Sequence, residues 1–233
     1  MRRTFIQRHP MTLPSASSAM QQSAALASAG AARVAQLKTV TRKNGEASFF
    51  FYEAHFKNAA VKVLPGEYFV DNDDLLVMTT LGSCIAACLW DRHAQIGGMN
   101  HFMLPEGHGD SGRYGSYAME LLINEMMKRG ASKSRMEAKI FGGGAVIAGM
   151  NTINVGERNT NFVIDFLKLE RIPIVSKDVM DVYPRKVCFL PKSGKAMVKR
   201  LAPTNTDALV QQDRTAAQQA QPVASTGGSI DLF

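Results

Sequence analysis

The chain has 233 residues, 45% hydrophobic and 20% charged, which is the composition of an ordinary soluble globular protein. Its 27 lysines and arginines exceed its 20 aspartates and glutamates, and the resulting charge of +7 would suit a nucleic-acid-binding protein. However, residues 1–45 hold seven basic and no acidic residues, so the rest of the chain is balanced at 20 of each. This placement argues against nucleic acid as a partner. No stretch approaches the about 18 consecutive apolar residues of a membrane helix, so we do not expect an integral membrane protein.

Composition divides the chain into three parts. Residues 1–45 are rich in Ala, Ser, Gln and Arg, which predicts a disordered or weakly helical basic arm. Residues 202–233 predict a second flexible, disordered tail, although residues 230–233 (Ile-Asp-Leu-Phe) form an apolar tip. Residues 46–201 remain as the folded domain. Three cysteines without secretory features indicate a reducing compartment, so we expect the protein in the cytoplasm.

Apolar runs between turn residues predict the elements of this domain in chain order. Helical periodicity predicts one helix over residues 112–129, capped by Ser111 and Gly130, and a second over residues 156–170. We therefore expect an α/β layered sandwich with a mixed β-sheet, flanked by two principal helices. The predicted strands are residues 61–64, 67–70, 75–80, 84–90, 95–104, 137–141, 172–176, 186–190 and 195–201.

Cys84 is the first candidate functional residue. It follows a Leu-Gly-Ser corner and opens an apolar strand, where backbone amides are able to face a bound oxyanion. If Arg92 and His93 form a two-residue hairpin loop, Cys84 lies directly opposite His101 on the next strand. A thiol and an imidazole at this separation form a nucleophile and its base. A bulge at the glycines 97–98 would flip the faces, and a structural histidine is the simpler alternative.

A third group must orient the imidazole of such a pair. Thr79 and Thr80 precede the glycine corner and are both candidates, whereas Asn100 is predicted to point to the face opposite His101. The two other cysteines, Cys88 and Cys188, lie within apolar strands and are expected in the core.

Two further segments bear on binding. The glycines 142–144 follow a strand but lack the lysine and serine of a phosphate loop, so we expect them to permit close approach of a neighbouring strand or of substrate. Residues 155–159 begin the second helix, and their amides, with Arg158 and Asn159, are candidates for holding a carboxylate or amide group. No Cys or His spacing matches a structural zinc site, and we expect neither metal nor cofactor.

Four motifs together resemble the CheD family. They are residues 79–84 (Thr-Thr-Leu-Gly-Ser-Cys), 98–105 (Gly-Met-Asn-His-Phe-Met-Leu-Pro), 139–143 (Lys-Ile-Phe-Gly-Gly) and 155–159 (Val-Gly-Glu-Arg-Asn). The resemblance implies a glutamine deamidase of bacterial chemotaxis that converts glutamine side chains of methyl-accepting receptors to glutamate. It also implies, for some members, receptor methyl-ester hydrolysis and binding to a CheC-type phosphatase.

The resemblance further assigns roles to individual residues. It implies that Cys84 is the nucleophile, His101 the base and Thr79 the third residue, with Thr80 as the alternative because the spacing varies by one. Ser83 is expected near the oxyanion, and Gly143 with Arg158 and Asn159 near the substrate. Two other functions stay open on the sequence: a non-catalytic adaptor that binds receptors or a phosphatase, and a cysteine peptidase.

Overall fold

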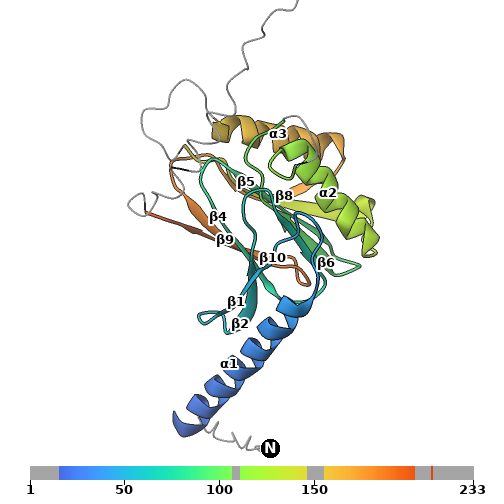
Figure 1. Cartoon of the computed structure of the whole chain (residues 1–233). Helices are drawn as coiled ribbons and strands as arrows, with labels where there is room; N and C mark the ends of the chain where they lie inside the picture. The colour runs from blue at the N-terminus through green and yellow to red at the C-terminus, as the bar shows by residue number, and fades with distance from the viewer. Residues whose placement is uncertain (1–15, 107–110, 146–154, 203–210, 212–233) are drawn as a thin grey trace, which may run out of the picture.

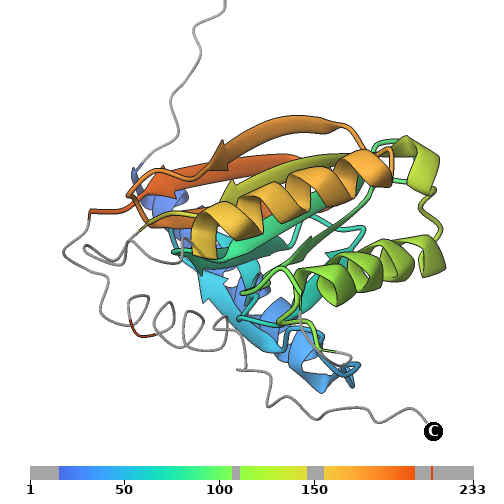
Figure 2. The same cartoon turned by 90° about the horizontal axis from the view of Figure 1, so that it is seen from above.

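The computed structural model describes residues 16–106, 111–145, 155–202 and 211. Within them, two five-stranded sheets and three α-helices form stacked layers (Figures 1 and 2). The inner sheet has the strand order β3-β6-β5-β7-β8, and the outer sheet has the order β1-β2-β4-β9-β10. All strand pairs are antiparallel except β7–β8 and β2–β4. The layered α/β sandwich with mixed pairing is therefore confirmed, with two sheets where a single one was expected.

The inner sheet lies between the outer sheet and two helices, α2 (Gly115–Lys128) and α3 (Val155–Leu169). Its strands are β3 (Tyr68–Asp71), β5 (Ile85–Asp91), β6 (Ile96–Asn100), β7 (Met136–Gly142) and β8 (Ile174–Val179), and a short 3-10 helix, η1 (Lys133–Arg135), precedes β7. The outer sheet comprises β1 (Phe49–Glu53), β2 (Asn58–Lys62), β4 (Leu76–Leu81), β9 (Arg185–Leu190) and β10 (Lys195–Arg200). Strand β1 was not among the predicted strands.

Side-chain alternation explains this stacking. Successive residues of β5 point to opposite faces of the inner sheet. Cys84, Ala86 and Cys88 therefore join the cluster between the two sheets, whereas Ile85 and Ala87 join the cluster beneath α2 and α3. Because both faces of β5 are buried, its sequence is an almost continuous apolar run.

The N-terminal segment differs from the prediction. Residues Ala16–Thr39 form helix α1, where a disordered or weakly helical arm was expected. Alanine is the best helix former, and the last turns of α1 gain tertiary support. Val34 packs into the cluster between the sheets, and Arg33 Nη2 lies 2.5 Å from Asp73 Oδ2. The predicted C-terminal tail and its apolar tip lie outside the described residues, apart from residues 202 and 211.

The ends of α2 agree in part with the prediction. Gly130 follows the C-cap Arg129 with a φ of +103°, the left-handed conformation expected of a glycine that ends a helix. Tyr114, rather than Ser111, occupies the N-cap position.

The β5–β6 hairpin has a longer loop than predicted. Asp91 pairs with Ile96, so four residues form the loop instead of two. The Asp91 carboxylate accepts hydrogen bonds from the backbone N–H groups of His93 and Ala94, and this network favours the longer turn. The expected direct pairing of Cys84 with His101 is therefore wrong by two residues. A shift of two preserves side-chain faces, so both residues still point between the two sheets.

Candidate active site

Cys84 lies where the chain crosses from one sheet to the other. β4 of the outer sheet ends at Leu81, β5 of the inner sheet begins at Ile85, and the intervening residues make the crossing. The Cys84 side chain is fully buried in the cluster between the sheets. The sequence produces this corner because a glycine and a serine separate two apolar strands.

His101 follows directly on β6 and shares the layer of Cys84. The adjoining backbone pair Ile85–Phe102 exchanges two hydrogen bonds of 3.0 Å, which places Cys84 and His101 on diagonal positions of the same face. Diagonal neighbours across antiparallel strands are within reach of long side chains such as imidazole. The backbone of His101 is held on the other side by bonds to Gly66 and Glu67. The structure thus places the two residues on diagonal positions of one sheet face despite the changed register.

Thr79 orients the His101 ring. The Thr79 hydroxyl lies 2.8 Å from the carbonyl oxygen of Val63 and 2.9 Å from His101 Nδ1. A carbonyl oxygen only accepts, so the hydroxyl donates its hydrogen to Val63 and accepts one from Nδ1–H. This network assigns the proton of the neutral ring to Nδ1 and leaves a lone pair on Nε2. Nε2 is buried and has no hydrogen-bond partner among the residues that the structure describes.

Burial also fixes the charge of His101. The ring is 1% exposed, and burial lowers its pKa from the ordinary value of 6.5 to about 4, with the nearby Lys62 ammonium acting in the same direction and the Val63 carbonyl opposing it. Lowering occurs because an ion loses its hydration in the interior. At neutral pH, His101 is therefore an uncharged base.

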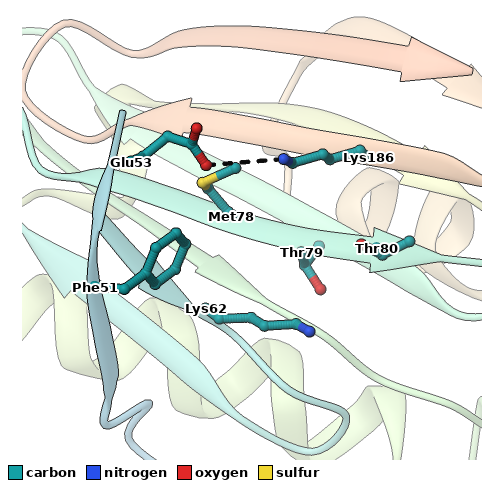
Figure 3. Close-up of a pocket in the computed structure, with 7 residues that line it drawn as sticks. All are labelled: Phe51, Glu53, Lys62, Met78, Thr79, Thr80 and Lys186. Carbon is teal, nitrogen blue, oxygen red and sulfur yellow. Dashed lines mark ion pairs between the residues drawn. The ribbon is translucent and has the colours of Figure 1, made fainter. Parts of the chain in front are cut away.

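Thr80 lies on the other face of β4, away from His101. Thr80 and Met78, which is two residues earlier on the same face of β4, border a cavity of about 230 Å³ on the outer side of the outer sheet (Figure 3). The geometry therefore places Thr79, and not Thr80, next to the imidazole. The cavity is lined by Phe51, Glu53, Lys62, Met78, Thr79, Thr80 and Lys186.

The glycines of residues 142–144 lie against the Cys84 turn, residues 82–84. The N–H of Gly143 donates to the carbonyl of Cys84, and the N–H of Gly144 donates to that of Gly82, both over 2.8 Å. A Cβ at Gly142 would lie 2.1 Å from the Cys84 carbonyl oxygen. The expected close approach to a neighbouring strand is found. The Gly143 N–H is already bonded to protein, so the predicted contact with substrate has no support from this group.

Asn159 joins the two halves of the candidate site. Its side-chain Nδ2 donates to the carbonyl of Ser83 over 3.0 Å and to that of Met103 over 2.8 Å. Ser83 precedes Cys84, and Met103 lies two residues after His101. One fully buried amide of α3 therefore bonds both segments. The sequence motif predicted Asn159 near the substrate, but no local pattern indicates these two hydrogen bonds.

The remaining predicted site residues differ in position. Ser83, which precedes Cys84 in the chain, is buried, and Arg158 is exposed on the first turn of α3. Their predicted contacts with oxyanion and substrate stay predictions. Asn100 points away from His101, as expected, and bonds Ala87 and Ala118 on the helix side of the inner sheet.

The two other cysteines are buried in the core, as predicted. Burial raises the pKa of both thiols, so Cys88 and Cys188 remain protonated and are poor nucleophiles. Across the described segments, no group of three or more His, Cys, Asp or Glu side chains is arranged to hold a metal ion. None of the described helices is long and apolar enough to cross a membrane.

A family model and the curated sequence relatives agree on one family. Residues 103–200 match a family model described as CheD chemotactic sensory transduction. A protein of Albidiferax ferrireducens named probable chemoreceptor glutamine deamidase CheD 1 is 58% identical over 89% of this chain and 90% of its own length. Relatives named probable chemoreceptor glutamine deamidase CheD are 49% identical in Janthinobacterium sp. (78% of this chain, 93% of theirs) and 46% in Bordetella petrii (83% and 91%).

A solved structure, the Bacillus licheniformis hypothetical protein YfiH, aligns with 49% of this chain and 51% of its own at 11% identity and a TM-score of 0.35, too weak a likeness for any inference. The sequence relatives, in contrast, match 89% and 78% of this chain at 58% and 49% identity. The chain belongs to the CheD family.

Proposed function

We propose that this protein is a chemoreceptor glutamine deamidase, which hydrolyses glutamine side chains of methyl-accepting chemoreceptors to glutamate and releases ammonia. The named activity of its relatives supports this reaction, and the Thr79–His101 hydrogen bond of 2.9 Å is the observation that carries the mechanism. This bond presents a neutral imidazole, with its free lone pair on Nε2, in the same buried layer as the Cys84 thiol.

The first half of the reaction forms a thioester. His101 Nε2 takes the Cys84 proton while the sulfur attacks the side-chain carbonyl carbon of glutamine. Backbone amides around Ser83 and Cys84 are the proposed donors to the resulting oxyanion. When the carbon–nitrogen bond breaks, the protonated His101 gives its proton to the departing nitrogen, which leaves as ammonia.

The second half restores the enzyme. Water attacks the thioester carbon and gives a proton to His101, the carbon–sulfur bond breaks, and the thiol regains its proton. The product is a glutamate side chain, which adds one negative charge to the receptor. Throughout the cycle, Thr79 holds the imidazole by its Nδ1–H, so that Nε2 faces the reacting atoms in both protonation states.

The reaction is proposed to take place in the cytoplasm, where receptor signalling domains are accessible. Association with a CheC-type phosphatase stays a prediction; co-purification with a purified phosphatase of that type checks it.

The decisive experiment incubates the protein with purified receptor cytoplasmic domains and maps the masses of proteolytic fragments. We expect defined glutamines to gain the mass of conversion to glutamate with the wild type. The variants Cys84→Ala and His101→Ala should lose this conversion, Thr79→Val should slow it by about tenfold or more, and Cys188→Ala, the matched cysteine control, should retain it. Unchanged glutamine despite tight receptor binding would instead identify an adaptor.

A further inference from the structure

The loop between β8 and β9 presents an apolar surface to solvent. Met180 is 37% exposed, Val182 53% and Tyr183 39%. Nowhere else in the described ranges do three exposed large apolar side chains fall within four residues. Scattered exposed apolar residues are ordinary, but a contiguous group is typical of a surface that contacts another molecule.

A buried arginine holds this loop in place. Arg185 is fully buried, and its guanidinium donates to the backbone carbonyls of Tyr183 over 2.9 Å and Met180 over 2.5 Å. Its Nε donates to Asp178 Oδ1 over 2.8 Å. A guanidinium is costly to bury unless all of its donors find partners. These hydrogen bonds therefore hold the loop in one conformation, so its surface is preorganised.

The backbone of the loop is also in an uncommon conformation. Met180 has a φ of +63° and Asp181 a φ of +68°, in the left-handed region that favours glycine. Strained non-glycine residues that persist in a structure are concentrated at functional sites. Residue 180 is thus a methionine, with a large apolar side chain, at a backbone conformation that glycine would adopt with less strain.

One backbone layer, residues 142–144, separates the loop from the Cys84 turn. The N–H of Met180 donates to the carbonyl of Gly142, and the N–H of Ala145 donates to that of Asp181. A Cβ placed on Gly144 would lie 3.2 Å from the Tyr183 carbonyl oxygen and 3.4 Å from the Gly82 carbonyl oxygen. The apolar loop and the Cys84 turn thus lie at the same end of the sandwich, where β4, β7 and β8 end (Figure 2).

The charges around the loop compensate one another. Arg185 and Arg200 both pair with Asp178, and Arg200 also pairs with Asp181. Two cations thus face two anions, and the Arg200 guanidinium lies 6.0 Å from the centre of the Tyr183 ring. A balanced cluster gives an acidic or phosphorylated partner no net attraction, so the surface fits an apolar patch.

We propose that Met180, Val182 and Tyr183 form a docking wall for the receptor surface that flanks the target glutamine, with an apolar patch of that surface as the occupant. This inference rests on the proposed function, because it assigns the substrate contact of the same site. The docking wall selects folded receptor domains, while Cys84 and His101 act on whichever glutamine is thereby brought to them.

The test combines Met180→Gly, Val182→Ser and Tyr183→Ser in one variant. Glycine suits the φ of residue 180, so this change removes the side chain without straining the loop. We expect the KM for a purified receptor cytoplasmic domain to rise about tenfold or more, as for loss of clustered apolar contacts. The rate at which iodoacetamide alkylates Cys84, followed by mass mapping, should stay at the wild-type value. The matched control is Leu169→Ser, which removes a side chain that is 79% exposed at the C-terminal end of α3.

Binding without turnover separates the docking wall from the chemistry. In a Cys84→Ala background, the three loop changes should weaken calorimetric binding of the receptor domain by the same factor. An unchanged KM and affinity would overturn the proposal, and so would an equal fall in Cys84 alkylation, since the loop would then act on the turn itself. Absence of deamidation by the wild type would overturn the proposed function. The binding measurement would still show whether the docking wall contacts the receptor domain.

Discussion

His101 is uncharged at neutral pH chiefly because its ring is buried away from water. Its pKa of about 4, against an ordinary 6.5, follows first from burial. A buried neutral base suits the proposed step, because it receives the Cys84 proton only when the thiol attacks. Thr79 supplies orientation without adding a charge, in contrast with sites where a carboxylate faces the imidazole.

The depressed pKa of His101 predicts how stability depends on pH. Between about pH 6.5 and pH 4 the unfolded chain binds a proton at this residue and the folded protein does not, so acidification favours unfolding. The unfolding free energy should fall by about 3 kcal/mol from this residue alone as the pH drops through that window. Urea unfolding at several pH values measures it, and His101→Gln should remove this part of the slope. An equal slope in the wild type and the variant would contradict the assigned pKa.

At the scale of elements, the candidate site depends on backbone contacts between segments far apart in the sequence. The glycines after β7 donate their N–H groups to the carbonyls of Cys84 and Gly82, and Asn159 of α3 donates to the carbonyl of Ser83. Such contacts leave no room for side chains. Gly142 and Gly130 make a matched pair for testing this, because their φ values are +108° and +103°.

We predict that Gly142→Ala is much more damaging than Gly130→Ala. Both substitutions put a side chain at a left-handed φ, which costs about 1–2 kcal/mol. At residue 130 the nearest atom to the new Cβ is Ile96 Cδ1 at 4.0 Å, whereas at residue 142 it is the Cys84 carbonyl oxygen at 2.1 Å. Gly142→Ala should therefore lower the melting temperature further and slow deamidation, and Gly130→Ala should leave the deamidation rate unchanged. Equal effects in thermal unfolding and in rate would show that the contact with Cys84 does not matter.

Sequence patterns predicted most elements because their signals are local. The apolar run of β5 and the periodicities of α2 and α3 need no tertiary information. The hairpin register was wrong because the Asp91 side chain stabilises a longer turn than the one assumed. Cys84 and His101 are therefore not directly opposite each other, but a shift of two residues keeps both on one face.

Other features of the site depend on tertiary packing, so local sequence patterns do not predict them. The choice of Thr79 over Thr80 requires knowing which face of β4 meets the inner sheet, because both threonines suit a strand equally well. The tie made by Asn159 spans 76 residues to Ser83, a separation that no local pattern encodes. Helix α1 was underestimated for the same reason, because its support comes from β1 and β2.

At the scale of the whole molecule, the basic N-terminal segment is partly neutralised by the folded domain. Three ion pairs form between the segment and the domain: Arg33 with Asp73, Arg42 with Glu46, and Lys43 with Glu125. The charge that first suggested nucleic acid thus serves in part to attach the segment to the domain, although the division of the chain at residue 45 stays a prediction.

Arg42 should therefore matter to global stability. Its guanidinium bonds Glu46 and the Leu37 carbonyl and lies 4.7 Å from the centre of the Phe50 ring. Arg42→Ala removes these contacts and leaves the buried Glu46 carboxylate with the Lys43 N–H and with Arg129 at 3.6 Å, so the unfolding free energy should fall by about 2–4 kcal/mol. Lys38→Ala, at an exposed position of α1, should stay within about 0.5 kcal/mol of the wild type. Chemical unfolding of both variants measures this; equal stabilities would show that the segment is not attached in this way.

The central claim is that Cys84 performs covalent amide hydrolysis on receptor glutamine. Mass spectrometry of enzyme that is acid-quenched during turnover of a purified receptor domain tests it most directly. We predict an acyl adduct on the Cys84 fragment, equal in mass to the receptor segment minus ammonia. An adduct on Cys88 or Cys188 in place of Cys84 would contradict the mechanism.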